Sequence, residues 1–279
     1  IKRARQHVTR SVKQLVSGVE SLLEQATIDV LPGHGRFLTD REIAITLPDG
    51  ERVIEADNII LATGSVPVTE IVEGHDGLNV WTSDQALFLP KVPESMIVIG
   101  SGATGMEMSQ AYLHFGTKVT VMELFDRPLP REDHDASEVV LRTFQRRGGR
   151  FEVNAMVRRI EDTADGMKRV IFERAGEEAH LEAEVVLMAI GRRANLKNLG
   201  AEEIGLRIER QGICVQAGVS TPASDQTHPP EAMCPGTQLE TSIPHIYAIG
   251  DCIRGIGLAH LAMHEATAAV ETIHGMYSH

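Results

Sequence analysis

The residues whose types and spacing could do chemistry form a glycine-rich turn, in the stretch MIVIGSGATGME from Met96 to Glu107. Three glycines here have the spacing G-x-G-x-x-G. In a turn from a strand into a helix, the first glycine permits the bend, the second lets the backbone approach a pyrophosphate, and the third lets the helix pack on the strand. The diphosphate would lie on the positive end of the helix. The predicted contacts are Gly100, Ser101, Gly102, Ala103, Thr104, Gly105 and Glu107.

A carboxylate follows this turn at the distance expected for a ribose contact. Glu123 ends the run KVTVME, 23 positions after Gly100 (123 − 100). A carboxylate in this place accepts hydrogen bonds from a free ribose diol and repels a 2′-phosphate, so the sequence predicts NAD rather than NADP. Arg127, four residues on, leaves an alternative open, because an arginine can turn toward a phosphate. An ordinary surface or ion-paired arginine at this position is the other interpretation of the same sequence.

The elements that must position this turn follow from the hydrophobic pattern. An apolar run suited to a buried strand precedes the glycines, a helix-compatible segment reaches Phe115, and a second apolar run begins at Lys118. Further on, a charged amphipathic helix ends at two glycines, and strands surround a charged turn. The expected ranges are Met96 to Ile99, Asp135 to Arg146, Val157 to Glu173 and Leu181 to Ile190. Strands alternating with helices predict an α/β fold.

The flanking regions carry the same kinds of pattern. Apolar residues three and four apart predict an amphipathic helix over Val8 to Leu23. Short β-type runs, separated by turn residues, predict a small meander and then a buried strand that ends in Thr63. The expected strands are Ile28 to Leu31, Glu42 to Leu47, Arg52 to Glu55, Asn58 to Ala62 and, near the end, Ile246 to Ile249; a closing helix is expected over Leu258 to Ile273.

Composition limits the classes of function. The 279 residues are 42% hydrophobic, enough for two domains, and the net charge of −12 disfavours a nucleic-acid partner. No apolar run approaches 18 residues and no secretory leader is evident, so the expectation is a cytoplasmic protein without a membrane segment. Cys214, Cys234 and Cys252 show no CxxC or CxxxxC spacing. Neither a disulfide framework nor a metal site is therefore expected.

Four motifs stand in order along the chain: LATGS, GSGATGME, AIGRRAN, and YAIGDC with LAHLAMHEA. Together they resemble the flavin-dependent pyridine nucleotide-disulfide oxidoreductases over nearly the whole chain, and most strongly the branch that oxidises dihydrolipoamide. The resemblance implies FAD and NAD as cofactors. It also implies two Rossmann-like three-layer domains, with the NAD domain inserted in the FAD domain. The expected division is a partial FAD-binding domain at 1–92, an NAD(P)-binding domain at 93–212 and a returning FAD-binding segment at 213–279.

The resemblance assigns roles to matching positions. Gly35 would lie near the FAD adenine, and Thr63, Gly64 and Ser65 would form the turn beside the same nucleotide. Asp251 would accept hydrogen bonds from the ribitol side, because a carboxylate offers acceptors only. The remaining assignments are Leu258, Ala259 and His260 facing the flavin ring, Val157 at the adenine edge of NAD, and Gly191 on its nicotinamide side. Taken singly, each has an ordinary alternative: a strand-ending turn, a helix cap or a structural histidine.

The family's catalytic pairs are not assigned to residues of this sequence. Its redox pair has the spacing CxxxxC, which does not occur in the chain. Its acid-base pair, with the spacing HxxxxE, belongs to the family's dimerisation domain, and neither His274 nor His279 is followed by a glutamate five positions on, so no catalytic residue is assigned. We expect a fragment, inactive alone, of an enzyme that passes hydride between NAD(H) and FAD and exchanges electrons with a disulfide. A small-molecule or lipoyl-domain substrate, a 2-oxo acid dehydrogenase complex as partner and a homodimeric full-length form are implied.

Other interpretations of these motifs remain open. Flavoproteins resembling mercuric reductase, soluble transhydrogenase or NADH oxidase share the same motifs, and a non-catalytic nucleotide-binding module would need no redox pair. A flavoprotein without dithiol chemistry is a further alternative. The polar segment from Ala217 to Gly236 is longer than the family's connection. It is expected to be a surface loop, either a tolerated insertion or a partner-docking insert.

Overall fold

The computed structural model describes residues 1–209, 212–215, 239–253, 255 and 257–276. The predicted loop from Ala217 to Gly236 lies outside them. The chain divides into two compact units. Unit 1 contains residues 1–27 and 67–192, and unit 2 contains residues 28–66 and 193–279. Both units mix helices and strands, as the α/β prediction required.

Unit 1 is built on a five-stranded parallel sheet in the order β6-β13-β7-β8-β9. The strands are β6 (Val80–Thr82), β13 (Val185–Met188), β7 (Ser95–Ile99), β8 (Lys118–Met122) and β9 (Arg150–Glu152). Every residue of β13 is buried, as are the last four of β7. Such continuous apolar runs are typical of strands covered on both faces. The predicted strands on either side of the glycine turn are confirmed.

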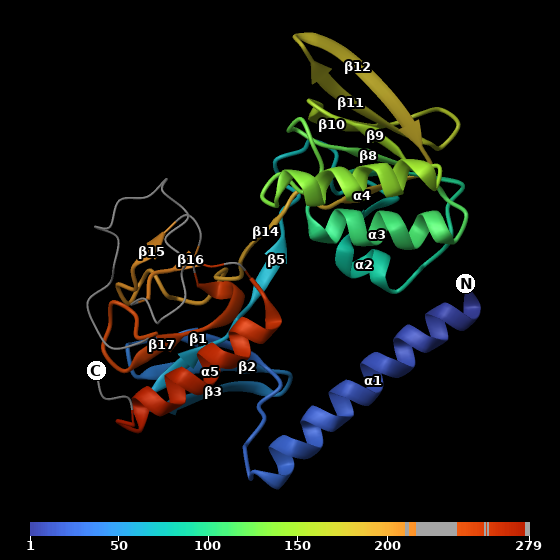
Figure 1. Ribbon diagram of the computed structural model, residues 1–279. Helices are drawn as coiled ribbons and strands as arrows, with labels where there is room; N and C mark the ends of the chain where they lie inside the picture. The colour runs from blue at the N-terminus through green and yellow to red at the C-terminus, as the bar shows by residue number, and fades with distance from the viewer. Residues whose placement is uncertain (210–211, 216–238, 254, 256, 277–279) are drawn as a thin grey trace. The chain divides into compact units, whose positions relative to one another are not determined.

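Three helices accompany this sheet. The structure has α2 (Ser83–Leu87), α3 (Ala103–His114) and α4 (His134–Arg146), and the latter two confirm the predicted helices. α3 lies against β7 and β8, and α4 lies against β9 (Figure 1). Tyr112 of α3 and Phe144 of α4 are almost completely buried in the core between helices and sheet. The Tyr112 hydroxyl donates to Ala86 O at 2.8 Å, which joins α3 to α2.

A second, antiparallel sheet of unit 1 is formed by β10 (Met156–Asp162), β11 (Lys168–Arg174) and β12 (Glu177–Ala183). The expectation of one strand over Val157 to Glu173 is wrong, because the chain turns back between β10 and β11. Gly166 adopts φ +82° in this turn, and Thr163 N donates to Met167 O at 3.0 Å. The range Leu181 to Ile190 likewise holds parts of two strands, β12 and β13.

The N-terminal helix α1 (Lys2–Gln25) confirms the predicted amphipathic helix and extends it at both ends. None of its residues is buried, and the Leu15 side chain is 72% exposed. Its N-terminal end contacts the rest of unit 1 through Arg5, whose guanidinium donates to Leu89 O at 2.7 Å and to Pro90 O. The apolar stripe that defined the helix in the sequence therefore faces solvent in this chain.

Unit 2 begins with a three-stranded meander, β1 (His34–Phe37), β2 (Glu42–Leu47) and β3 (Gly50–Glu55). The expected strand at Ile28 to Leu31 is wrong, and the first strand starts at His34. Pro32 has no amide hydrogen for a ladder, and Gly33 N turns back to Leu31 O at 2.9 Å. Pairing with β2 begins only at His34, opposite Thr46.

The remainder of unit 2 packs around a parallel strand pair. β4 (Ile59–Leu61) pairs with β17 (Ile246–Ala248), and α5 (Ala259–Ile273) closes the described chain. All three confirm predicted elements. Short pieces complete the structure: β5 (Ser65–Pro67) with β14 (Arg192–Ala194), β15 (Ile208–Glu209) with β16 (Gly212–Ile213), and a 3₁₀ turn at Gly250–Cys252.

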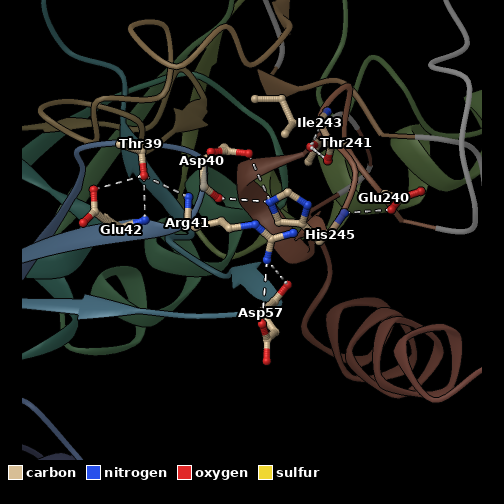
Figure 2. Close-up of polar contacts among 9 residues, drawn as sticks. All are labelled: Thr39, Asp40, Arg41, Glu42, Asp57, Glu240, Thr241, Ile243 and His245. Carbon is tan, nitrogen blue, oxygen red and sulfur yellow. Dashed lines mark hydrogen bonds and ion pairs between the residues drawn. The ribbon is translucent and has the colours of Figure 1, made fainter.

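Polar contacts tie the meander to the start of β17. Figure 2 shows His245 between the turn that precedes β2 and the segment that leads into β17. Its Nε2 donates to Asp40 O at 3.1 Å and lies 3.6 Å from the Asp40 carboxylate, while its amide donates to Glu240 Oε1 at 2.9 Å. His245 O in turn accepts from Ile59 N at 2.9 Å. One residue thus links β4, β17 and the meander.

The cysteines differ from expectation at one position. Cys214 is disulfide-bonded, whereas Cys252 is free and buried. Spacing along the sequence detects local cysteine motifs, but a disulfide requires only that two side chains meet in the fold, so the prediction without a disulfide is wrong for Cys214. Within the described part of the chain, no helix is long and apolar enough to cross a membrane.

Candidate nucleotide-binding sites

The three glycines between β7 and α3 differ in what a side chain would meet. At Gly100, where φ is +98°, a Cβ would lie 2.4 Å from Ala189 O. At Gly105 it would lie 2.1 Å from Gly100 O, so the helix approaches the strand as closely as backbone allows. At Gly102, the N-cap of α3, a Cβ would meet nothing within 4 Å. Gly102 therefore faces open space, beside helix amides that have no partner within the helix.

The other predicted members of the turn divide by exposure. Ala103 and Glu107 are exposed, and Thr104 is half-buried, so these three lie on the accessible side of the first helical turns. Ser101 is completely buried. Its carbonyl accepts from Leu129 N at 3.1 Å, and its other polar groups face Glu123. The turn thus combines the open N-terminus of α3 with a buried residue, Ser101, that is hydrogen-bonded to the rest of unit 1.

Glu123 follows β8 directly and is 6% exposed. Its Oε2 accepts hydrogen bonds from Ser101 N at 2.9 Å and from the Ser101 hydroxyl. Its Oε1 accepts from Phe125 N at 3.1 Å. The carboxylate therefore lies beside the glycine turn, as the spacing predicted, and the chain's own donors already hold it in place. The sequence pattern gave no sign of the Ser101 contact.

Arg127 is engaged away from this carboxylate. Its guanidinium donates to Pro130 O at 2.9 Å and to Ser137 Oγ at 3.2 Å, and the side chain is half-buried. Ser137 is buried in α4, so these contacts fix the loop between β8 and α4. A structural role thus accounts for this arginine without any phosphate.

The two more distant predicted contacts of unit 1 lie on different elements. Val157 is half-buried in β10 and pairs with Phe172 of β11. Gly191 is exposed, has φ +138°, and accepts from Val68 N at 3.0 Å. Open space surrounds the position of its missing Cβ. Gly191 lies two residues after Ala189, whose carbonyl oxygen lies against Gly100, whereas Val157 belongs to the separate antiparallel sheet.

A cavity of about 340 Å³ in unit 2 is lined by two of the residues expected at an FAD adenine, Gly35 and Thr63. The Thr63 hydroxyl is buried and has no hydrogen-bond partner. Buried hydroxyls without partners are uncommon and call for an explanation such as an absent ligand. The sequence did not single out the other polar residues on this wall: His34, Arg36, Asn195 and Lys197.

The turns after β4 and β17 meet through side chains. Ser65 Oγ donates to Asp251 Oδ2 at 2.7 Å, and Gly64 adopts φ +69° before it. Gly250 N donates to Glu265 Oε2 of α5 at 2.6 Å. The structure therefore brings together Gly64, Ser65 and Asp251, which the sequence predicted separately. Glu265 lies in the quoted motif LAHLAMHEA, but the sequence gave it no role.

The start of α5 holds the last predicted contacts. Leu258 is the N-cap, Ala259 begins the helix, and all three of Leu258, Ala259 and His260 are exposed. No side chain caps this end of the helix. Its first amides are thus available to a partner, which agrees with a role for backbone rather than side chains. Within the described residues, no group of three or more acidic, histidine or cysteine side chains could hold a metal ion.

Comparisons with known proteins agree with this arrangement. The family described as pyridine nucleotide-disulphide oxidoreductase matches residues 1–227. A dihydrolipoyl dehydrogenase of Bacillus subtilis (strain 168) is 32% identical over 264 residues, which cover 95% of this chain and 53% of that protein. One of Chlorobaculum tepidum is 35% identical over 278 residues, covering 99% and 54%. The chain spans about half the length of the curated relatives it matches.

Solved structures show the same fold. Two Cu(II) complexes of the HOCl-induced flavoprotein disulfide reductase RclA from Escherichia coli, one of them a mutant, superpose on this chain with TM-scores of 0.77 and 0.80. The mutant complex is 24% identical and the match covers 99% of this chain and 59% of that one. At this level of identity the likeness shows the fold alone.

Proposed function

The chain belongs to the pyridine nucleotide-disulphide oxidoreductase family, and from this premise we propose that it is the nucleotide-binding portion of an FAD-dependent enzyme that uses NAD(H). The observation that carries the proposal is the pairing of an open helix end at Gly102 with the buried carboxylate of Glu123 beside it. The first suits a diphosphate and the second suits a ribose hydroxyl.

The residues of unit 1 fit the nicotinamide coenzyme. Amides at the start of α3 would hold the pyrophosphate, with Gly102 leaving room for it and Glu123 facing the adenine ribose. We assign Val157 to the adenine edge and Gly191 to the nicotinamide side on the resemblance to the family. Because Arg127 is bound to Pro130 and Ser137, no cation from this arginine is offered to a 2′-phosphate, which supports NAD over NADP.

The residues of unit 2 fit FAD. The buried, unpartnered hydroxyl of Thr63 and the backbone at Gly35 line a cavity suited to an adenine, and Asp251 offers acceptors to a polyol. The exposed start of α5 at His260 and the residues before it suit the flavin ring. The resemblance to the family supports FAD-binding parts at residues 1–92 and 213–279 and an NAD(P)-binding part at 93–212. The compact units divide differently, since residues 67–92 belong to unit 1 and residues 193–212 to unit 2.

When bound, the two cofactors supply hydride transfer between nicotinamide and flavin. The chain's own residues bind and orient them. Gly105 keeps α3 close to β7, so that its helix amides face the diphosphate, and Glu265 holds the Gly250 amide and thereby the turn that carries Asp251. An open helix N-terminus such as that of α5 stabilises negative charge, as a reduced flavin carries.

For the whole enzyme we propose dihydrolipoyl dehydrogenase activity, a lipoyl substrate, a 2-oxo acid dehydrogenase complex as partner, a homodimer and a cytoplasmic location. The curated relatives named dihydrolipoyl dehydrogenase support the activity. Flavoproteins of the mercuric reductase, transhydrogenase or NADH oxidase type, and a non-catalytic nucleotide-binding module, are the alternatives, since the chain contains no CxxxxC pair.

Ligand binding to the 279-residue chain tests the proposal. We expect saturable binding of NADH, and binding of FAD that added ADP weakens, because ADP would compete for the cavity at Thr63. The visible spectrum of the purified chain reports any flavin that remains bound. A chain that binds neither NADH nor FAD contradicts the proposal. A chain that binds NADH and not FAD agrees both with a fragment whose FAD-binding domain is only partial and with the simple nucleotide-binding module.

A further inference from the structure

We propose that Ser101 is a positioning residue that fixes Glu123 for recognition of the coenzyme ribose, and that it thereby contributes to the choice of NAD(H) over NADP(H). The inference rests on the proposed function, since it concerns the same coenzyme site. It goes beyond the glycine pattern, in which the second position is open to any residue.

The contact between the two residues is short and sheltered. Ser101 is 0% exposed and Glu123 is 6% exposed, so water has little access to either. The Ser101 amide donates to Glu123 Oε2 at 2.9 Å, and the hydroxyl of the same residue donates to the same oxygen. Hydrogen bonds to an ionised group are stronger than neutral ones, more so where water is excluded. Ser101 therefore holds one oxygen of the carboxylate with two donors.

Only one oxygen of the Glu123 carboxylate has an acceptor position left for a ribose hydroxyl. A carboxylate has about four lone-pair positions. Ser101 takes two of them on Oε2, and Phe125 N takes one on Oε1 at 3.1 Å. The position that remains for a ribose hydroxyl is therefore on Oε1. With Oε2 anchored, the carboxylate cannot turn to offer a different atom or to withdraw its charge.

This anchoring has opposite consequences for the two coenzymes. A free 2′-hydroxyl gains an acceptor that is already in the right orientation, so little ordering is needed on binding. A 2′-phosphate meets a fixed negative charge, and Arg127, the nearest arginine along the chain, is already bound to Pro130 O and Ser137 Oγ. Loosening the carboxylate should weaken NADH binding and relieve the repulsion of NADPH.

The test compares Ser101→Ala with Ser109→Ala in the 279-residue chain. Ser109 is also completely buried, lies in α3, and has a hydroxyl without a hydrogen-bond partner, so its removal is a matched control. Dissociation constants for NADH and NADPH are measured by calorimetry. Where the heat of NADPH binding is too small to fit, NADPH is titrated into the chain with NADH already bound, and the displacement of NADH is followed. Ser101→Cys keeps the shape of the side chain but replaces the hydroxyl by a larger and much weaker donor. Thermal unfolding without ligand checks that each variant folds.

We expect Ser101→Ala and Ser101→Cys to weaken NADH binding about tenfold, the loss of about one hydrogen bond to a charged group. NADPH should change less or bind more tightly, so the preference for NADH falls at least about fivefold. Ser109→Ala should keep both affinities within about twofold. Variants at Ser101 that fold and keep the preference of the unaltered chain overturn the inference. An unaltered chain that does not bind NADH contradicts the proposed function instead.

Discussion

The Ser65 hydroxyl donates a hydrogen bond of 2.7 Å to Asp251 Oδ2, across 186 positions of the sequence. The two residues follow the neighbouring parallel strands β4 and β17. The carboxyl ends of parallel strands are where α/β folds place their ligands. The bond therefore fixes the carboxylate that we assign to the ribitol side of FAD.

Replacing Ser65 should lower both the stability of the chain and its affinity for FAD. In Ser65→Ala, Asp251 loses a donor, and we expect the free energy of unfolding to fall by about 1 kcal/mol because the pair is only half-buried. FAD should bind several-fold more weakly. Ser83→Ala is the control, since the Ser83 hydroxyl is bonded to its exposed neighbour Asp84. Equal FAD affinity in Ser65→Ala and the unaltered chain would contradict the role given to Asp251.

Two glycines of the nucleotide turn should respond to alanine in different ways. A Cβ at Gly105 would lie 2.1 Å from Gly100 O, so Gly105→Ala must displace α3, with a loss of unfolding free energy of about 2 kcal/mol or more. A Cβ at Gly102 meets open space, so Gly102→Ala should fold normally yet bind NADH at least about tenfold more weakly. Chemical denaturation and calorimetry measure the two effects. A Gly102→Ala chain with unaltered NADH affinity would place the diphosphate elsewhere.

Replacing Thr63 should raise the stability of the chain and lower its affinity for FAD. Its hydroxyl is buried without a partner, so Thr63→Val removes an unsatisfied polar group and should raise the free energy of unfolding by about 1 kcal/mol. FAD or ADP binding should weaken, because the hydroxyl no longer serves the ligand. Ser109→Ala removes another unpartnered hydroxyl and should leave ADP affinity unchanged. If Thr63→Val binds ADP as tightly as the unaltered chain, the cavity is not the adenine site.

Tyr112 should make unit 1 sensitive to alkaline pH. Burial raises the pKa of its hydroxyl from the ordinary value of 10 to about 12. The unfolded chain therefore loses this proton before the folded chain does, and stability present below pH 10 declines as the pH rises from 10 to 12. A rise of the pKa from 10 to about 12 corresponds to a loss on the order of 2–3 kcal/mol. In Tyr112→Phe this part of the pH dependence should disappear; unfolding curves with the same alkaline slope in both chains would argue against it.

The sequence predicted the elements whose burial is periodic or continuous. Buried strands such as β7 and helices such as α4 follow directly from apolar spacing, because core packing selects those residues. The β10–β11 hairpin was missed since its strands carry charge on the exposed face and its turn depends on one residue, Gly166, at positive φ. The strand expected at Ile28 failed because apolar β-formers still need a partner strand.

The candidate sites were predictable where a motif requires particular backbone, and less so where side chains meet across the fold. The spacing of Gly100, Gly102 and Gly105 indicated the turn, and the structure supplies a separate steric reason for Gly100 and Gly105. The anchoring of Glu123 by Ser101 depends on a contact between two strand ends, which spacing alone does not report. The disulfide at Cys214 was missed because it too depends on two side chains that meet in the fold, which the spacing of cysteines does not report.

The measurement that tests the central claim most directly is a calorimetric titration of the 279-residue chain with NADH and, in parallel, with NADPH at equal concentration. The open end of α3 at Gly102 and the anchored carboxylate of Glu123 predict saturable binding of one NADH per chain, at least about tenfold tighter than NADPH. Absence of NADH binding by a folded chain, or tighter binding of NADPH, would contradict the account.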